Sequence, residues 1–367
     1  MKYLLFILLM LLACKKEKNE IISNPNTPNP STEYYFPPIN SSEWDVANLN
    51  ELGYDLPDTS ELYDFLSQSG TRAFILMENG KIAIEKYWGN NILNTSEFSK
   101  DSQWYWASAG KTITSFLLGL AQEDGLLNIE NKTSEYLGNN WTNMVLEKEN
   151  LISVKHQLTM TTGLDYNVSD LDCTSPSCLT YKENAGDQWY YHNAPYTLLK
   201  NVVENATGIS FNAYTDQKLE STIGMQGNWL QLSELNVYSS TARDAARFGS
   251  LLLNNGEWDG NQIMTDQNYF ESMVNSSQTI NPSYGYLFWL NGKSSVVFPG
   301  STFSFNQQIS DNAPQDLYAA LGKNGQFILI IPSRNMVVIR MGESPDNSLV
   351  PIVFHDLMWE KINEVIN

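Results

Sequence analysis

The sequence predicts an α/β fold of the α+β kind, in which an antiparallel sheet of about five strands is flanked by helices and carries a mainly helical insertion. Residues 74–77 and 82–88 have the pattern of two strands joined by Asn79-Gly80, a pair that suits the tight turn of a β-hairpin. Three more apolar runs near the other end of the chain are typical of strands: residues 317–321, 327–331 and 336–341. Because the two groups come from opposite chain ends, we expect them to form one sheet.

Helical patterns fill the middle of the chain and its last residues. Residues 196–206 and 241–254 are each followed by a glycine, which favours the end of a helix. Residues 350–366 repeat apolar side chains at helical spacing. We therefore expect an α/β part at about 44–125 and 290–367, and a helical part at about 126–289.

The first thirteen residues have the pattern of a signal peptide. Lys2 precedes an apolar run at residues 4–12 that is too short to cross a bilayer as a helix. The run stops at Cys14 in a sequence like the bacterial lipobox, which predicts lipidation of this cysteine; a secreted protein with an incidental cysteine is the alternative. We expect a lipoprotein of the bacterial cell envelope. Lys15 gives no obvious signal for retention at the inner membrane, so the outer membrane is preferred.

Residues 14–43 differ in composition from the rest of the chain. They are rich in Asn, Pro, Ser, Lys and Glu and poor in the apolar side chains that would offset the entropy lost on ordering. This composition predicts a flexible tether between the lipidated cysteine and one folded domain at 44–367.

The net charge of −19 comes from 41 acidic and 22 basic residues that are spread along the chain. Nucleic acids and anionic membrane surfaces bind basic faces of proteins. We therefore expect no nucleic acid as a partner, and contact with a membrane only through the lipid anchor.

Cys173 and Cys178 lie in a stretch without helical or strand period. Exported proteins meet an oxidising compartment, so a disulfide that pins a loop is favoured over two free thiols. The chain has three histidines and none lies at ligand spacing from these cysteines, which argues against a zinc site. We expect neither a metal nor another cofactor.

The candidate chemistry begins at Ser108-Ala109-Gly110-Lys111, which opens an apolar run typical of a helix. Residues i and i+3 share a helix face, so the lysine amine can lie beside the serine hydroxyl and act on its proton. No Gly-x-Ser-x-Gly motif surrounds any serine, and the scarce histidines make a histidine-based triad unattractive. Ser108 is therefore a candidate nucleophile with a base other than histidine.

Two further motifs follow in order along the chain: Tyr191-His192-Asn193 before a predicted helix, and Lys323-Asn324-Gly325 before a predicted strand. With Ser108-x-x-Lys111 they make residues of about 71–342 resemble the serine β-lactamase and penicillin-binding protein superfamily. The resemblance is greater to its class C-related serine hydrolases, which include esterases, D-amino-acid peptidases and 6-aminohexanoate-dimer hydrolases. It implies a β-lactamase/transpeptidase-like fold.

The resemblance also implies roles for the motif residues. Ser108 would attack a carbonyl carbon to form an acyl-enzyme that water later hydrolyses. Either Lys111 with a lowered pKa or Tyr191 as phenolate would be the general base, and Lys323 would help to lower the pKa of Lys111. The sequence does not choose between the two bases.

The remaining implied roles concern the substrate. The backbone N–H groups of Ser108 and Gln326 would stabilise the oxyanion, Gly325 would let its strand approach the substrate, and Asn193 would orient the substrate or Lys111. A plain hairpin turn is the alternative interpretation of Lys323-Asn324-Gly325.

One residue departs from the pattern of dedicated β-lactamases, which usually carry Thr or Ser where this chain has Asn324. We therefore expect an exported esterase or amidase that acts on a small ester, amide or peptide. A D-amino-acid peptidase, a β-lactamase or a penicillin-binding protein is the alternative within the same superfamily. A binding or sensor protein that keeps the fold without turnover is the alternative of another class.

Overall fold

The computed structural model describes residues 34–366, and the account below concerns that part of the chain. The predicted signal peptide, Cys14 and the first part of the predicted tether lie outside the described residues. Between residues 34 and 366, no helix combines the length and apolar character needed to cross a membrane.

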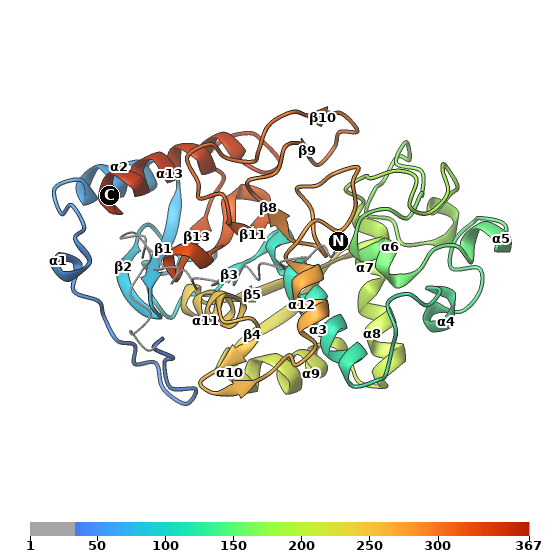
Figure 1. Ribbon diagram of the computed structural model, residues 1–367, viewed down its shortest axis with the longest axis horizontal. Coiled ribbons are helices and arrows are strands. Elements are labelled where there is room, and N and C mark those ends of the chain that lie inside the picture. The colour runs from blue at the N-terminus through green and yellow to red at the C-terminus, as the bar shows by residue number, and fades with distance from the viewer. Residues whose placement is uncertain (1–33, 367) are drawn as a thin grey trace, which may run out of the picture. The chain divides into compact units, whose positions relative to one another are not determined.

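The main sheet has six antiparallel strands in the order β2-β1-β13-β12-β11-β8 (Figure 1). Five strands correspond to the predicted apolar runs at both chain ends: β1 (Thr71–Glu78), β2 (Lys81–Tyr87), β11 (Tyr318–Gly322), β12 (Gln326–Ile331) and β13 (Met336–Gly342). The sixth, β8 (Trp289–Leu290), is too short to leave a strand pattern. The prediction of one sheet built from both ends of the chain is confirmed.

Helices cover both faces of this sheet. Every residue of β12 and β13 is buried, which explains why these strands are continuous apolar runs rather than alternating ones. On one face Phe327 packs against Phe354 of α13 (Ile352–Ile366), whose ring also stacks on Phe65 of α2 (Thr59–Gln68). On the other face lies α11 (Ala242–Leu253), where a Cβ on Gly249 would come within 2.5 Å of Val337 Cγ1.

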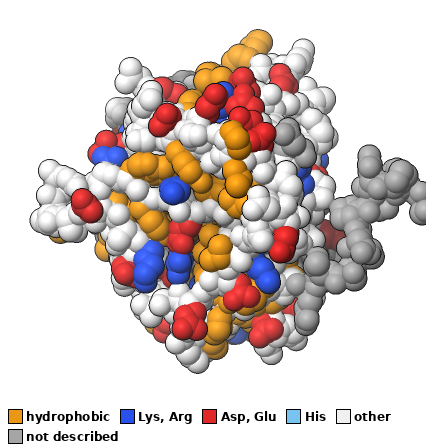
Figure 2. Space-filling model, turned by 90° about the vertical axis from the view of Figure 1, so that its left-hand side faces the viewer, with side chains coloured by type: hydrophobic (Ala, Val, Ile, Leu, Met, Phe, Trp, Pro, Cys, Tyr) orange, Lys and Arg blue, Asp and Glu red, His pale blue; other side chains and the backbone are white. Residues whose placement is uncertain are grey.

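The side of the molecule that lies at the left of Figure 1 has a mixed surface. Figure 2 shows acidic, basic and hydrophobic side chains interspersed on this side of the molecule. Val353 and Leu357 are exposed apolar residues of α13. This view shows no single broad basic patch.

The inserted part is mainly helical, but two of its strands pair with β3 (Trp104–Tyr105) of the α/β part in a three-stranded sheet that the sequence analysis missed. The order of this sheet is β3-β5-β4, with β5 at Leu235–Ser240 and β4 at Gly227–Leu232. The predicted helix at 196–206 is divided into α7 (Asn193–Thr197) and α8 (Leu199–Thr207). The predicted helix at 241–254 is α11, whose first turn is closed by a capping box between Thr241 and Asp244.

The other elements are α3 and a set of shorter helices, turns and hairpins. The helices are α1 (Leu49–Leu52), α3 (Lys111–Glu123), α4 (Ser134–Leu137), α5 (Leu146–Glu149), α6 (Val154–Leu158), α9 (Phe211–Thr215), α10 (Ser221–Ile223) and α12 (Gln267–Met273). The tighter turns are the 3₁₀ segments η1 (Ala107–Gly110), η2 (Pro176–Cys178), η4 (Lys323–Gly325) and η5 (Pro332–Arg334), with a π-helical segment η3 (Asp216–Glu220). Two hairpins pair β6 (Glu257–Trp258) with β7 (Asn261–Gln262), and β9 (Val296–Val297) with β10 (Ser304–Phe305).

Residues 34–43, which the sequence analysis assigned to the tether, lie against the folded body. Tyr35 N–H donates to the Asn79 carbonyl at 3.0 Å, and the Phe36 ring packs on Trp258. The Arg247 guanidinium donates to backbone carbonyls of this segment, including that of Pro38 at 2.9 Å. The boundary of the body therefore moves from residue 44 to residue 34, because three consecutive aromatic residues interrupt the polar composition there.

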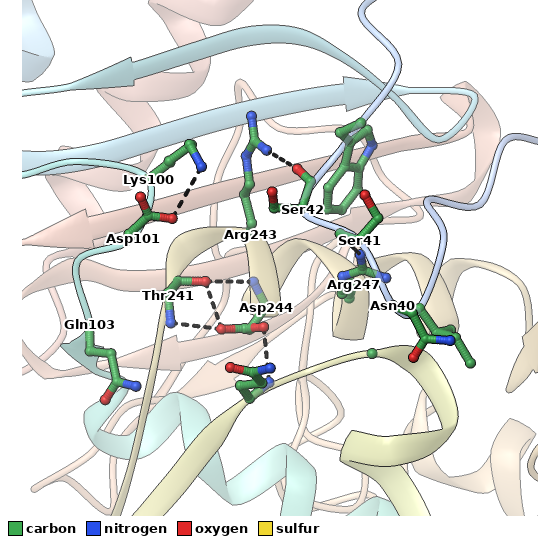
Figure 3. A pocket seen from close by; sticks show the side chains of 14 residues that line it. Asn40, Ser41, Ser42, Lys100, Asp101, Gln103, Thr241, Arg243, Asp244 and Arg247 are labelled. Carbon is green, nitrogen blue, oxygen red and sulfur yellow. Dashed lines mark hydrogen bonds and ion pairs between the residues drawn. The ribbon is translucent and has the colours of Figure 1, made fainter.

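A cavity of about 530 Å³ lies between this N-terminal segment and α11 (Figure 3). Arg243 reaches the Ser42 carbonyl at 2.7 Å and also pairs with Glu85, so its charge is already neutralised. Lys100 pairs with Asp101 in the same way. Arg243 and Arg247 thus hold the N-terminal segment in place, whereas Lys100 and Asp101 pair with each other.

Candidate active site

Ser108 lies in the turn η1, between β3 and the start of α3. Ala107 immediately before it has a φ of 48°, a strained value for a residue other than glycine. The turn is held by Trp106, whose backbone N–H donates to the Tyr238 carbonyl at 2.8 Å and whose indole donates to Ser240 Oγ at 2.9 Å. Packing of a buried tryptophan thus fixes the conformation that presents the serine.

Lys111 is the first residue of α3, a helix that is buried along most of its length. Its Nζ lies 3.3 Å from Ser108 Oγ, as the i, i+3 spacing predicted. The side chain is only 4% exposed and lies over the rings of Tyr196 at 4.0 Å and Tyr191 at 5.4 Å. Burial lowers the pKa of Lys111 to about 7, although the nearby Asp172 carboxylate acts in the opposite direction. Near neutral pH a large fraction of this amine is free to accept a proton.

Tyr191 is the other candidate base, and its environment favours the neutral phenol. Burial raises the pKa of Tyr191 above its usual range, while the neighbouring Ser108 hydroxyl lowers it to a smaller extent. Its ring stacks on Trp289 with the centroids 5.9 Å apart. Of the two groups beside Ser108, Lys111 is therefore the better proton acceptor, and Tyr191 is suited to donate a proton.

Asn193 begins α7 and lines the same cavity as Ser108. Its Nδ2 donates to Asp172 Oδ1 at 2.8 Å. Its Oδ1 is buried and has no hydrogen-bond partner among residues 34–366. Asp172 directly precedes Cys173, which forms a disulfide with Cys178, so the predicted pairing of these cysteines is confirmed.

Lys323, Asn324 and Gly325 form the turn η4 between β11 and β12, as the alternative interpretation of this motif had it. Lys323 is exposed and lines the cavity. Asn324 has a φ of 64°, and its Nδ2 donates to the Tyr105 hydroxyl at 2.8 Å. The motif is thus both a hairpin turn and a source of one cavity residue.

Gly325 and Gln326 lie away from the residues that line the cavity. A Cβ on Gly325 would meet Arg340 Nη1 at 2.8 Å, so this glycine makes room for Arg340 rather than for a substrate. The Gln326 side chain is 2% exposed and binds the Gly342 backbone through both amide atoms, at 2.7 and 3.0 Å. The structure therefore does not bring these two predicted residues to the cavity.

Gly322, a residue to which the sequence analysis gave no separate role, makes the close approach instead. A Cβ at this position would lie 2.6 Å from the Trp106 carbonyl oxygen and 3.0 Å from the Ala109 nitrogen. β8 pairs with β11 only at Tyr318 and Ala319, so the rest of this edge is free to lie beside η1. The sequence feature that could have indicated this close approach is a glycine at the end of an apolar strand and directly before a lysine.

The cavity has a volume of about 490 Å³ and brings together Ser108, Lys111, Tyr191, Asn193 and Lys323. Asp172, Tyr105 and Tyr196 add polar groups to it. Its apolar lining comprises Ala107, Leu171, Leu232, Leu235, Val237, Pro299, Leu349 and Val350. None of the three histidines lines it, and within residues 34–366 no cluster of three or more potential metal ligands is found.

Comparisons with known proteins bear on the family and the fold of the chain. The model of the beta-lactamase family matches residues 70–349. An uncharacterized protein from Alkalihalophilus pseudofirmus is 26% identical over 331 residues, which cover 82% of this chain and 89% of the relative. A 6-aminohexanoate-dimer hydrolase from Paenarthrobacter ureafaciens is 21% identical over 335 residues, which cover 82% of this chain and 79% of the relative.

Solved structures show the same fold. A penicillin-binding protein homolog from Caulobacter crescentus superimposes with a TM-score of 0.66 at 11% identity, over 88% of this chain and 98% of the other. A family VIII carboxylesterase superimposes with a TM-score of 0.62 at 14% identity, over 84% of this chain and 98% of the other.

Proposed function

The chain belongs to the beta-lactamase family, and from that premise we propose that it is a serine hydrolase that cleaves small esters or amides through an acyl-enzyme on Ser108. One observation carries the proposal. Lys111 Nζ lies 3.3 Å from Ser108 Oγ, and burial lowers the pKa of Lys111 to about 7. A serine hydroxyl beside an amine that is neutral near neutral pH is an activated nucleophile.

In the first step Lys111 takes the Ser108 proton while Oγ forms a bond to the substrate carbonyl carbon. The tetrahedral intermediate then collapses, the bond to the leaving alcohol or amine breaks, and the leaving group takes a proton. Tyr191, whose phenol stays protonated, is placed beside Ser108 to give that proton and to recover one from Lys111. Water then attacks the acyl-enzyme by the reverse series of proton transfers.

The developing oxyanion requires fixed N–H donors. We assign these to the backbone N–H groups of Ser108, at the start of the α3 region, and of Lys323, directly after Gly322. The support is the close approach of Gly322 to Trp106 and Ala109 and the presence of Lys323 in the cavity. Lys323 thus takes the place that the sequence analysis gave to Gln326.

The cavity supports an ester or amide with an apolar acyl group better than a β-lactam. Its walls include eight aliphatic side chains, and such surfaces bind apolar groups without requiring polar partners. The Asn324 side chain is held by Tyr105 and does not line the cavity, so the middle residue of the Lys-x-Gly motif offers no hydroxyl to a substrate carboxylate that meets Lys323. The relatives named as a dimer hydrolase and a carboxylesterase act on amide and ester bonds in keeping with this choice.

An active-site probe tests the assignment of the nucleophile. A fluorophosphonate should label the purified domain, Ser108→Ala should abolish labelling, and the matched variant Ser60→Ala on the exposed start of α2 should keep it. Equal labelling of Ser108→Ala would overturn the proposal. Absent labelling of a folded wild type would favour the binding or sensor protein.

A substrate panel tests the reaction class. p-Nitrophenyl esters of short acids should be cleaved faster than a chromogenic cephalosporin, with D-amino-acid amides and a cell-wall pentapeptide as the other arms. A faster cephalosporin reaction would move the assignment to a β-lactamase, and a faster D-amide reaction to a D-amino-acid peptidase.

We also propose that the chain is a lipoprotein of the bacterial cell envelope, anchored through Cys14. The support is the lipobox-like end of the apolar run in the sequence. Metabolic labelling with a palmitate analogue should mark the wild type and not Cys14→Ser, and label on both would refute the anchor.

A further inference from the structure

One part of the cavity wall directly precedes a loop that is closed by the Cys173–Cys178 disulfide. Leu171 and Asp172, directly before the first cysteine, both line the cavity. The bridge spans a sequence separation of only 5, so the chain it restrains is short and local. Its position next to Asp172 links it to the proposed catalytic groups.

Asp172 determines which atom of the Asn193 amide remains available to the site. A carboxylate accepts hydrogen bonds and does not donate them, so the group that meets Asp172 Oδ1 at 2.8 Å must be the amide nitrogen of Asn193. The amide oxygen is thereby turned away from Asp172, and it has no donor within residues 34–366. Without the carboxylate, either atom of the amide could take either direction.

Other contacts hold this loop in register with the site. The Leu171 carbonyl accepts the Ala194 N–H at 3.0 Å, which ties the loop to the first turn of α7. On the far side of Cys173, Thr174 Oγ1 donates to Glu234 Oε2 at 2.8 Å. Glu234 lies in the turn between β4 and β5, whose residues Leu232 and Leu235 line the cavity. The disulfide therefore lies between two attachments to cavity walls.

We propose that Asp172 is a positioning residue that fixes the orientation of the Asn193 amide in the cavity that also holds Lys111, and that the Cys173–Cys178 disulfide holds Asp172 in that place. The inference rests on the proposed function, because it concerns the same site. Asp172 also carries the one carboxylate among the cavity residues, and its charge favours the ammonium form of Lys111.

The groups around Lys111 define what a pH profile should report. They are Ser108 on η1, Tyr191 and Tyr196 beside and within α7, Asp172 on the disulfide loop, and Lys323 at the end of β11. His192 also faces Asp172, but burial lowers the pKa of His192 to about 4, so it stays neutral where Lys111 titrates. A change at Asp172 therefore acts on the pH profile through Lys111.

The variant Asp172→Asn keeps the shape of the side chain and removes its charge. It should lower kcat/KM for a p-nitrophenyl ester about tenfold, mainly through kcat, the loss expected for one charge-assisted hydrogen bond. It should also move the acid limb of the pH profile to lower pH, because the ammonium form of Lys111 loses its neighbouring carboxylate. Asp172→Glu should restore the position of the limb in part. The control Asp187→Asn, a charge removed from an exposed loop residue, should leave the profile unchanged.

Reduction tests the contribution of the disulfide. Dithiothreitol converts the bridge into two thiols and is itself oxidised to its cyclic disulfide. It should reduce kcat/KM of the wild type severalfold, as should the double variant Cys173→Ser/Cys178→Ser without reductant. It should have little further effect on Asp172→Asn, because the element that the bridge positions is already lost.

An unmoved acid limb in an active, folded Asp172→Asn variant would overturn the inference, as would an equal effect of reductant on that variant and on the wild type. Thermal melting identifies a variant that fails to fold, in which case Asp172→Glu and the reductant experiment still decide. Fluorophosphonate labelling of each variant separates the two proposals. Labelling that depends on Ser108 with no effect of Asp172 refutes this inference alone, whereas labelling that survives Ser108→Ala refutes the proposed function.

Discussion

Two turns each bring a lysine to the same cavity, and they differ in what surrounds the amine. Lys111, on the buried turn at the start of α3, is 4% exposed and packed between two tyrosine rings. Lys323, on the hairpin turn after β11, is exposed to solvent. Loss of hydration disfavours the charged form of Lys111, whereas an exposed ammonium can attract an anionic group of a substrate. Burial rather than residue type thus separates a candidate base from a candidate binding group.

The largest expected effect comes from removing the two lysines separately. Lys111→Met should lower kcat/KM for a neutral p-nitrophenyl ester about 10³-fold, because Ser108 loses its proton acceptor. Lys323→Met keeps the backbone N–H and should change the same reaction less than about tenfold, with a larger rise in KM for an ester that carries a carboxylate. Steady-state kinetics of both variants measure the difference. Equal losses for the neutral ester would remove the distinction between the two lysines.

The pH dependence tests the same distinction without a mutation. The pKa of Lys111 is lowered to about 7, so kcat/KM should fall about tenfold for each pH unit below that value as the amine becomes protonated. A rate that stays constant from pH 8 to pH 5 would exclude Lys111 as the base.

The free energy of unfolding should depend on the ionisation of Lys111 above pH 7. Between the folded pKa of about 7 and the ordinary value of 10.5, the unfolded chain binds a proton at this lysine that the folded chain does not. Stability therefore rises with pH across this window. Denaturant unfolding of wild type and Lys111→Met should show that the variant lacks this rise, and parallel curves would contradict the shift.

Two glycines, one at each end of the turn after β11, should affect catalysis and stability differently when substituted. Gly322→Ala would place a methyl group 2.6 Å from the Trp106 carbonyl, which displaces η1 and should lower kcat about ten- to a hundredfold. Gly325 has a φ of 74°, and a Cβ at this position would contact Arg340. Gly325→Ala should therefore cost about 1–3 kcal/mol of stability and leave the rate per folded molecule unchanged. Kinetics corrected by active-site titration distinguish the two. A larger loss of rate in Gly325→Ala would place that glycine at the site after all.

Substitutions of Asn324 should have the smallest effects on stability and activity. Its φ of 64° suits Asn or Gly, so Asn324→Gly should be close to neutral and Asn324→Thr should lose about 1–2 kcal/mol because a β-branched residue is strained there. Neither variant should gain cephalosporin hydrolysis, since this side chain does not line the cavity. Thermal melts and a chromogenic cephalosporin measure both, and new hydrolysis by Asn324→Thr would contradict the placement of the turn.

The sequence predicted the parts of the molecule in which local pattern and burial agree. The apolar runs of β12 and β13 predicted central strands, and the spacing of Ser108 and Lys111 predicted their contact, since both depend on neighbours in the chain. The sequence did not reveal that β11 ends at Gly322 beside η1, because that approach joins segments far apart in the chain. Gln326 follows a matching motif but does not line the cavity, and its side chain binds the Gly342 backbone.

The prediction that the tether extends to residue 43 was wrong for a different reason. Composition averaged over residues 14–43 hid three consecutive aromatic residues, whose binding sites are formed by Asn79, Trp258 and other distant positions. A window that is mostly polar can still end in an ordered anchor when its last residues are large and apolar.

The order of the strands has a consequence for how the chain is made. β1 lies between β2 and β13, so the strand that completes its pairing is the last one to be synthesised. Until Met336–Gly342 has been synthesised, the edge of Thr71–Glu78 that pairs with it has no partner. The residues between these two strands are therefore synthesised before this pair of strands can form. Completion of this sheet is therefore a late event in biosynthesis. A truncation before β13 should yield a chain that aggregates rather than a smaller folded body.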